Sequence, residues 1–152
     1  MNILEIFKPL RLSPRVSLGL LILRVVTGLA FIIHGYGKIT NPFAWMPPEA
    51  GVPWILQGLG ALSEFGGGLA WILGLLTPLA SLGLACTMAM AVWMHAVVRG
   101  DPFVPSGPGG SYELASIYLC IAVLLLLTGP GRFSLDRVVF GKRTADRETI
   151  RF

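Results

Sequence analysis

The chain alternates between long apolar runs and short connectors that are polar or rich in proline. Each run is close to the roughly 20 residues that an α-helix needs to cross the hydrocarbon core of a bilayer. Leu76, Thr77 and Pro78 join the second run to the third so tightly that the two must form an antiparallel hairpin. The pattern predicts an all-α integral membrane four-helix bundle with an antiparallel up-down topology, its helices at residues 17–37, 54–76, 79–98 and 112–128.

Composition favours a membrane protein over a soluble one. Of the 152 residues, 54% are hydrophobic and 13% are charged, whereas roughly 25% are charged in an ordinary soluble domain. Four spans of about 20 residues use just over half of the chain and leave only connectors. A separate soluble catalytic domain does not fit, so we expect residues 1–152 to form a single membrane domain.

Basic residues gather at the two ends of the apolar region: three precede the first run and six follow the last. By the positive-inside rule both termini face the cytoplasm, and the long connectors 38–53 and 99–111 face the outer side. Residues 129–152 form an interfacial tail, in which Ser134 caps a short segment. The net charge of +4 therefore reflects topology and does not indicate a nucleic-acid partner.

Two ionisable residues lie inside the apolar runs, where a charge costs at least ~2.5 to 3.5 kcal/mol unless it has a partner or a task. Arg24 lies about 10 Å from the cytoplasmic end of the first run, and Glu64 lies about 15 Å from the outer end of the second. In a core ~30 Å thick these depths allow an ion pair between them. Such a pair contributes to a substrate site or only fixes the helix register. A third hypothesis for the function of the protein is a small carrier in which Glu64 is the proton-coupled group.

Further titratable groups gather at the outer ends of three runs. His34 is followed one turn later by Lys38, His95 is followed one turn later by Arg99, and Glu113 begins the fourth run. We predict that His34, His95 and Glu113 are catalytic, and that Arg24, Lys38, Glu64 and Arg99 bind substrate.

This cluster suits a quinone headgroup site. A histidine donates a hydrogen bond to a carbonyl, and a second histidine or a carboxylate handles protons. Metal binding by His34, His95 and Glu113 is the competing chemistry. Lys38 and Arg99 count against a metal, because two positive charges repel a divalent cation, and they favour an anionic substrate. A simpler alternative is that the basic side chains only reach toward lipid headgroups.

Several segments resemble the DoxX family of small four-helix membrane proteins. They are Leu21–Lys38 with its R-to-HGxxK pattern, Glu64 before a glycine-rich stretch, His95, Glu113, and the sequence GPGRFSLD at Gly129–Asp136. The resemblance covers about residues 17–140. It implies the four-helix fold, a bacterial or archaeal inner membrane as the location, and a role linked to quinone, since the family is named for a subunit of a thiosulfate:quinone oxidoreductase. The family's polar positions correspond to Arg24, His34, Lys38, Glu64, His95, Glu113 and Arg132.

Together these observations predict a membrane subunit of a quinone-linked oxidoreductase that binds a quinone headgroup or a small anionic substrate near the outer face. The sequence carries no haem, flavin or iron-sulfur motif, so electrons would need a quinone or a partner subunit. We expect the bilayer and partner subunits or further copies of the chain as partners. The alternative is a non-enzymatic membrane anchor or assembly factor for a respiratory or redox-stress complex.

Overall fold

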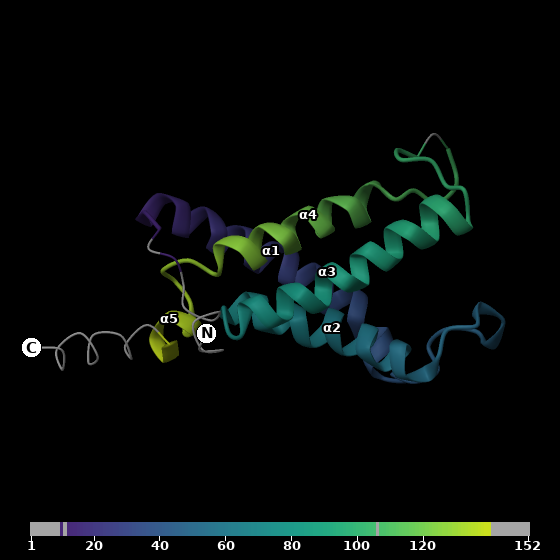
Figure 1. Ribbon diagram of the computed structural model, residues 1–152, viewed down its shortest axis with the longest axis horizontal. Coiled ribbons are helices and arrows are strands. Elements are labelled where there is room, and N and C mark those ends of the chain that lie inside the picture. Colours follow the sequence, from purple (N-terminus) through teal and green to yellow (C-terminus); the bar gives the residue numbers. More distant parts are fainter. Residues whose placement is uncertain (1–9, 11, 106, 141–152) are drawn as a thin grey trace, which may run out of the picture.

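The computed structural model describes residues 10, 12–105 and 107–140 (Figure 1). Within these residues the fold is helical throughout and contains no strand. The elements are α1 (Pro14–Ile39), a 3₁₀ turn (Pro48–Ala50), α2 (Trp54–Leu73), α3 (Thr77–Trp93) continued by a π-helical segment (Met94–Val98), α4 (Glu113–Thr128) and α5 (Leu135–Phe140). The predicted all-α class is confirmed, and the four long helices lie where the apolar runs predicted them.

Local sequence explains where α1 begins and where α2 gives way to α3. The Ser13 hydroxyl accepts a hydrogen bond from the backbone N–H of Val16, and Pro14 occupies the first helical turn, where its missing N–H is harmless. Gly74 ends α2 with a φ of 63°, a left-handed conformation that glycine adopts readily. Thr77 begins α3 only three residues later, so α2 and α3 form the expected tight hairpin.

Glycines allow α1 and α2 to approach closely. A Cβ atom on Gly28 would lie 2.7 Å from the carbonyl oxygen of Gly68, and one on Gly68 would lie 2.6 Å from that of Gly28. On the other face of α2, Trp71 is fully buried and donates a hydrogen bond to Ser81 of α3 at 3.0 Å. Gly28 and Gly68 therefore serve the packing of α1 against α2.

Large apolar side chains cover the surface of the four long helices, and two charged side chains within their apolar runs lie inside. Ile33 and Leu127 are 67% and 71% exposed, whereas Arg24 and Glu64 are buried. This distribution suits a surface that faces lipid. Among the described residues, two helices are long and apolar enough to cross a membrane, Pro14–Ile39 and Thr77–Val98, while α4 is apolar but has 16 residues.

The segment after α4 folds back onto the turn between α2 and α3. The fully buried carboxylate of Asp136 accepts hydrogen bonds from the backbone N–H groups of Leu76 at 2.7 Å and Thr77 at 2.9 Å. The Ser134 hydroxyl accepts from the N–H of Arg137, which confirms the predicted cap. The rest of the predicted interfacial tail, residues 141–152, lies outside the described residues, as do the basic residues Lys8 and Arg11.

Candidate functional site

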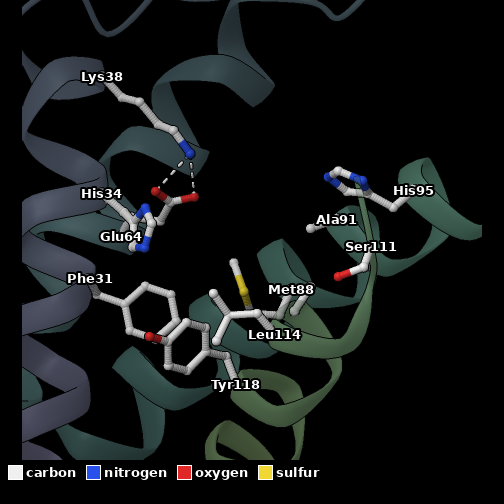
Figure 2. A pocket seen from close by; sticks show the side chains of 11 residues that line it. Phe31, His34, Lys38, Glu64, Met88, Ala91, His95, Ser111, Leu114 and Tyr118 are labelled. Atoms are coloured by element: carbon white, nitrogen blue, oxygen red, sulfur yellow. Dashed lines mark hydrogen bonds and ion pairs between the residues drawn. The ribbon is translucent and has the colours of Figure 1, made fainter. Parts of the chain in front are cut away.

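The two long connectors lie at the same end of the molecule (Figure 1). A cavity of about 250 Å³ lies between the helices near this end (Figure 2). Side chains from all four long helices and from the segment before α4 line it. They are Phe31, His34, Lys38, Glu64, Met88, Ala91, His95, Ser111, Leu114, Ala115 and Tyr118. Four of the seven residues predicted for the site therefore meet here: His34, Lys38, Glu64 and His95.

An ion pair between α1 and α2 forms one wall of the cavity. Lys38 Nζ donates to both carboxylate oxygens of Glu64, at 2.6 and 2.7 Å. The Glu64 side chain is 5% exposed and the Lys38 side chain 26%. A carboxylate at this depth requires a partner, because an isolated buried charge is strongly unfavourable. Lys38 supplies that partner, and its side chain also lines the cavity.

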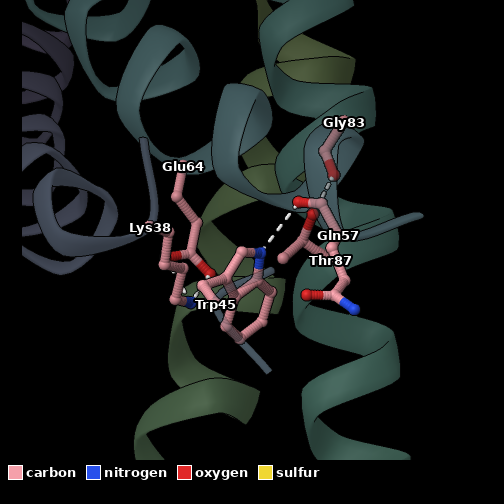
Figure 3. A network of polar contacts seen from close by, with 6 residues as sticks. All are labelled: Lys38, Trp45, Gln57, Glu64, Gly83 and Thr87. Carbon is pink, nitrogen blue, oxygen red and sulfur yellow. Dashed lines mark hydrogen bonds and ion pairs between the residues drawn. The ribbon is translucent and has the colours of Figure 1, made fainter. Parts of the chain in front are cut away.

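The connector between α1 and α2 is folded against this ion pair. Lys38 Nζ lies 4.6 Å from the centre of the Trp45 ring, a cation–π contact. The indole N–H of Trp45 donates to the carbonyl of Gln57 (Figure 3). The buried Gln57 amide in turn accepts from Met46 N–H and donates to the carbonyl of Val52. Residues 45–52 are thereby fixed to the start of α2, with Trp45 directly over Lys38.

Arg24 lies on α1 outside the cavity, so the Arg24–Glu64 ion pair that the depths allowed is wrong, and Glu64 bonds to Lys38 instead. One guanidinium nitrogen donates to the carbonyl of Phe133 at 2.6 Å, and the carboxylate of Asp136 acts on it electrostatically. Arg24 is fully buried among the groups that fix the C-terminal segment. The depth estimate allowed it to reach Glu64, but the fold supplies a nearer acceptor from 109 residues away in sequence.

His95 enters the cavity from the π-helical segment that ends α3. Its Nδ1 lies 2.7 Å from Oδ2 of Asp101, in the connector that follows. Figure 2 shows its ring on the side of the cavity opposite Lys38 and Glu64. His34 lies on α1 on the same side as Glu64, so two histidines from different helices border one space.

Glu113 and Arg99 do not line the cavity. By helical spacing Glu113 shares a face of α4 with Ser116 and Cys120, and these two residues border an apolar groove on the outside of α4. The cavity receives a different face of α4, which carries Leu114, Ala115 and Tyr118. Arg99 is exposed beyond the π-helical segment. The carboxylate that lines the cavity is therefore that of Glu64, in the place predicted for Glu113.

The cavity is apolar on one side and polar on the other. Phe31 and Tyr118 lie with ring centres 4.8 Å apart, beside Met88 and Leu114. The histidines, Ser111 and the ion pair provide hydrogen-bonding groups around this apolar side (Figure 2). Such a space suits a flat ring that carries polar substituents. In the part of the chain that the structure describes, no group of three or more His, Cys, Asp or Glu side chains is arranged to hold a metal ion.

Asp101, Gln57 and Tyr118 are among the residues at the site that were not predicted. Asp101 follows His95 by six residues in a connector, and no helical period relates the two. Gln57 is the one amide in the second apolar run, and its polarity in that setting was a usable signal. Tyr118 lies one helical turn after Leu114 on the face toward the cavity, but hydropathy alone does not say which face of an all-apolar helix turns inward.

Comparison with known proteins places these features in a family. The sequence profile of the DoxX family matches residues 19–96. An Escherichia coli protein described as "Inner membrane protein YqjF" is 32% identical over 127 residues, which cover 81% of this chain and 93% of the relative. A Bacillus subtilis protein described as "Putative oxidoreductase CatD" is 30% identical over 133 residues, covering 86% of this chain and 94% of the relative. No solved structure matches the chain.

Proposed function

The chain belongs to the DoxX family of membrane proteins, and from this premise we propose that it is the membrane subunit of a quinone-linked oxidoreductase. The cavity of about 250 Å³ between the four long helices receives the quinone headgroup. The observation that carries the proposal is the meeting of His34 and His95, from different helices, over the apolar surface of Phe31 and Tyr118. A relative whose name calls it an oxidoreductase adds support.

The residues present fit a quinone headgroup. Cavities for drug-sized ligands measure roughly 300 to 1,000 Å³, so a space of about 250 Å³ suits a substituted ring while its isoprenoid tail remains in lipid. Aromatic side chains stack on or pack against such a ring, and His34, His95 and Ser111 offer donors to its carbonyl oxygens. When bound, a quinone supplies two-electron, two-proton redox chemistry.

The charges of the cavity favour a neutral ring over an anion. Lys38 was expected to attract an anionic substrate, but Glu64 accepts both of its short hydrogen bonds and neutralises it. Arg99, the second expected cation, lies away from the cavity. The pair therefore contributes a dipole with almost no net charge, and the histidines remain to exchange protons with the ligand.

In the membrane we place α1, α2, α3 and α4 as a four-helix bundle with both termini on the cytoplasmic side. Arg15, Arg132 and Arg137 flank the end that carries α5, which the positive-inside rule assigns to the cytoplasm. The cavity then lies near the outer face, within reach of an electron donor or partner subunit on that side.

Histidine modification tests the proposal directly, because His34 and His95 are the two histidines of the chain and both border the cavity. The purified protein is treated with diethyl pyrocarbonate, with and without a short-tailed ubiquinone analogue, and the modified peptides are quantified by mass spectrometry. We expect the analogue to slow modification of both histidines, and an alkanol with the same tail to leave it unchanged. Equal rates with and without the analogue would refute quinone binding; protection by thiosulfate alone would point to the anionic substrate.

One observation favours the alternative of a non-enzymatic anchor or assembly factor. Arg24 and Asp136 fix the C-terminal segment to the helices and have no access to the cavity. If the polar residues of the cavity also serve only structure, His34→Ala will lower the abundance of the protein in the membrane. Normal abundance with loss of respiratory activity in the host membrane would exclude this alternative.

A further inference from the structure

The contact between His95 and Asp101 places a carboxylate behind the ring of a histidine that faces the cavity. The Nδ1 to Oδ2 distance is 2.7 Å, and the two side chains are 28% and 20% exposed. The other histidine differs: in the described part of the chain His34 makes no hydrogen bond through its ring. His95 is thus the histidine whose ring orientation the fold determines.

Several backbone contacts bring Asp101 to this position. The π-helical segment widens the end of α3, with the N–H of Arg99 bonded to the carbonyl of Met94. The N–H of Asp101 then donates to the carbonyl of His95 at 2.9 Å, which turns the connector back over the ring. A widened helical turn of this kind is rare and recurs at functional sites.

The far side of the connector leaves room for the Asp101 carboxylate. A Cβ atom on Gly110 would collide with Oδ2 of Asp101, so a side chain at position 110 would displace this carboxylate. The N–H of Glu113 donates to the carbonyl of Phe103, which holds the connector to the first residue of α4. Asp101 is therefore held on one side by the end of α3 and on the other by Gly110.

We propose that Asp101 is the positioning residue of His95 and holds its proton on Nδ1, so that Nε2 faces the cavity as the proton acceptor. The carboxylate of Asp101 accepts a hydrogen bond and has no proton to donate, so in neutral His95 the Nδ1 carries the proton and the lone pair lies on Nε2. This inference rests on the proposed function only for the ligand that gives up the proton. The position of the proton on His95 is a property of the protein without ligand.

The step that His95 performs is a simple proton transfer. Its Nε2 takes the proton of a ligand hydroxyl: the O–H bond breaks, an N–H bond forms, and the electron pair stays on the ligand oxygen. The carboxylate of Asp101 stabilises the positive ring that results. In the reverse direction the same nitrogen returns the proton. Across the cavity the Lys38–Glu64 pair is already satisfied by its own hydrogen bonds.

The experiment uses nitrogen NMR of the full-length protein with ¹⁵N-labelled histidine in lipid nanodiscs. With two histidines, His34→Gln assigns the remaining signal to His95. We expect neutral His95 in the wild-type protein to carry its proton on Nδ1. In Asp101→Asn the amide can donate to Nδ1, and we expect the signal to shift to the tautomer with the proton on Nε2. Gly110→Ala, which displaces the carboxylate, should reduce the Nδ1 tautomer as well.

Glu49→Gln is the matched control, because Glu49 is an exposed acid in the other connector, and we expect it to leave the His95 signal unchanged. A wild-type His95 with its proton on Nε2, or one whose tautomer is the same in Asp101→Asn, would overturn the inference. Quinone protection of the histidines is measured separately, so a failure of the proposed function is distinguishable from a failure of the Asp101 assignment. Where electron transfer to quinone is measurable, Asp101→Asn should lower its rate about 100-fold or more.

Discussion

Replacing Lys38 with Met removes the cation that binds Glu64 and leaves a carboxylate with 5% of its side chain exposed. Removing one partner of a buried ion pair lowers the free energy of unfolding by about 3 to 5 kcal/mol. For Lys38→Met we expect a decrease of about 3 kcal/mol, because Glu64 can take up a proton. The reverse change, Glu64→Gln, should cost less, about 1 to 2 kcal/mol, since Lys38 is 26% exposed and its ammonium can regain water.

The double variant Lys38→Met/Glu64→Gln removes both charges. Its decrease in the free energy of unfolding should therefore be well below the sum of the decreases in the two single variants. We expect an interaction free energy of about 2 kcal/mol between the two positions, within the range of roughly 0.5 to 3 kcal/mol that contacting residues show. Arg24 provides the matched control, because it bonds to Phe133, outside the cavity. The losses of Arg24→Met and Glu64→Gln should add to within about 0.5 kcal/mol.

The free energy of unfolding is measured for each variant by reversible denaturation in mixed detergent micelles, followed by circular dichroism. An interaction free energy near zero for Lys38 with Glu64, or a large one for Arg24 with Glu64, would refute the assignment of this ion pair.

Three further predictions concern the helices around the site. Asp136→Ala leaves the N–H groups of Leu76 and Thr77 without an acceptor and should lower the free energy of unfolding by about 2 to 4 kcal/mol; a melting temperature equal to that of wild type would contradict the role of Asp136 as a cap. Gly68→Ala places a methyl group against the backbone of α1 and should cost about 1 to 3 kcal/mol, whereas Gly19→Ala, with nothing within 4 Å, should be neutral in the same assay. In a cysteine-free background, an impermeant maleimide added outside whole cells should label Glu49→Cys and not Arg137→Cys, and the opposite pattern would invert the proposed topology.

The helices could be predicted from the sequence because the physical cause is local. Runs of about 20 apolar residues bounded by Pro, Gly or charged residues leave few alternatives to a helix. Even the short α5 was anticipated, because Ser134 follows a Gly-Pro-Gly break and caps the next turn. The prediction missed the 3₁₀ turn at Pro48–Ala50 and the π-helical end of α3, neither of which has a signature in the hydropathy pattern.

The partners of the buried charges could not be predicted, because they depend on contacts between distant segments. Helix geometry gave depths for Arg24 and Glu64, but both Lys38 and Arg24 were within reach of the carboxylate. The choice depends on the C-terminal segment, which returns to offer Arg24 the carbonyl of Phe133. Glu113 was expected to line the site, but a helix that is apolar on nearly every side does not reveal which of its faces turns inward.

Native mass spectrometry of the protein, released from membranes in lipid nanodiscs, tests the central claim most directly. Ala91 lines the cavity and Ala89, two residues earlier on α3, is exposed on the outer surface, so Ala91→Phe and Ala89→Phe form a matched pair. We expect the wild-type protein and Ala89→Phe to carry a bound quinone, and Ala91→Phe, in which the cavity is filled, to carry none. A wild-type protein without quinone, or equal quinone occupancy in the two variants, would contradict it.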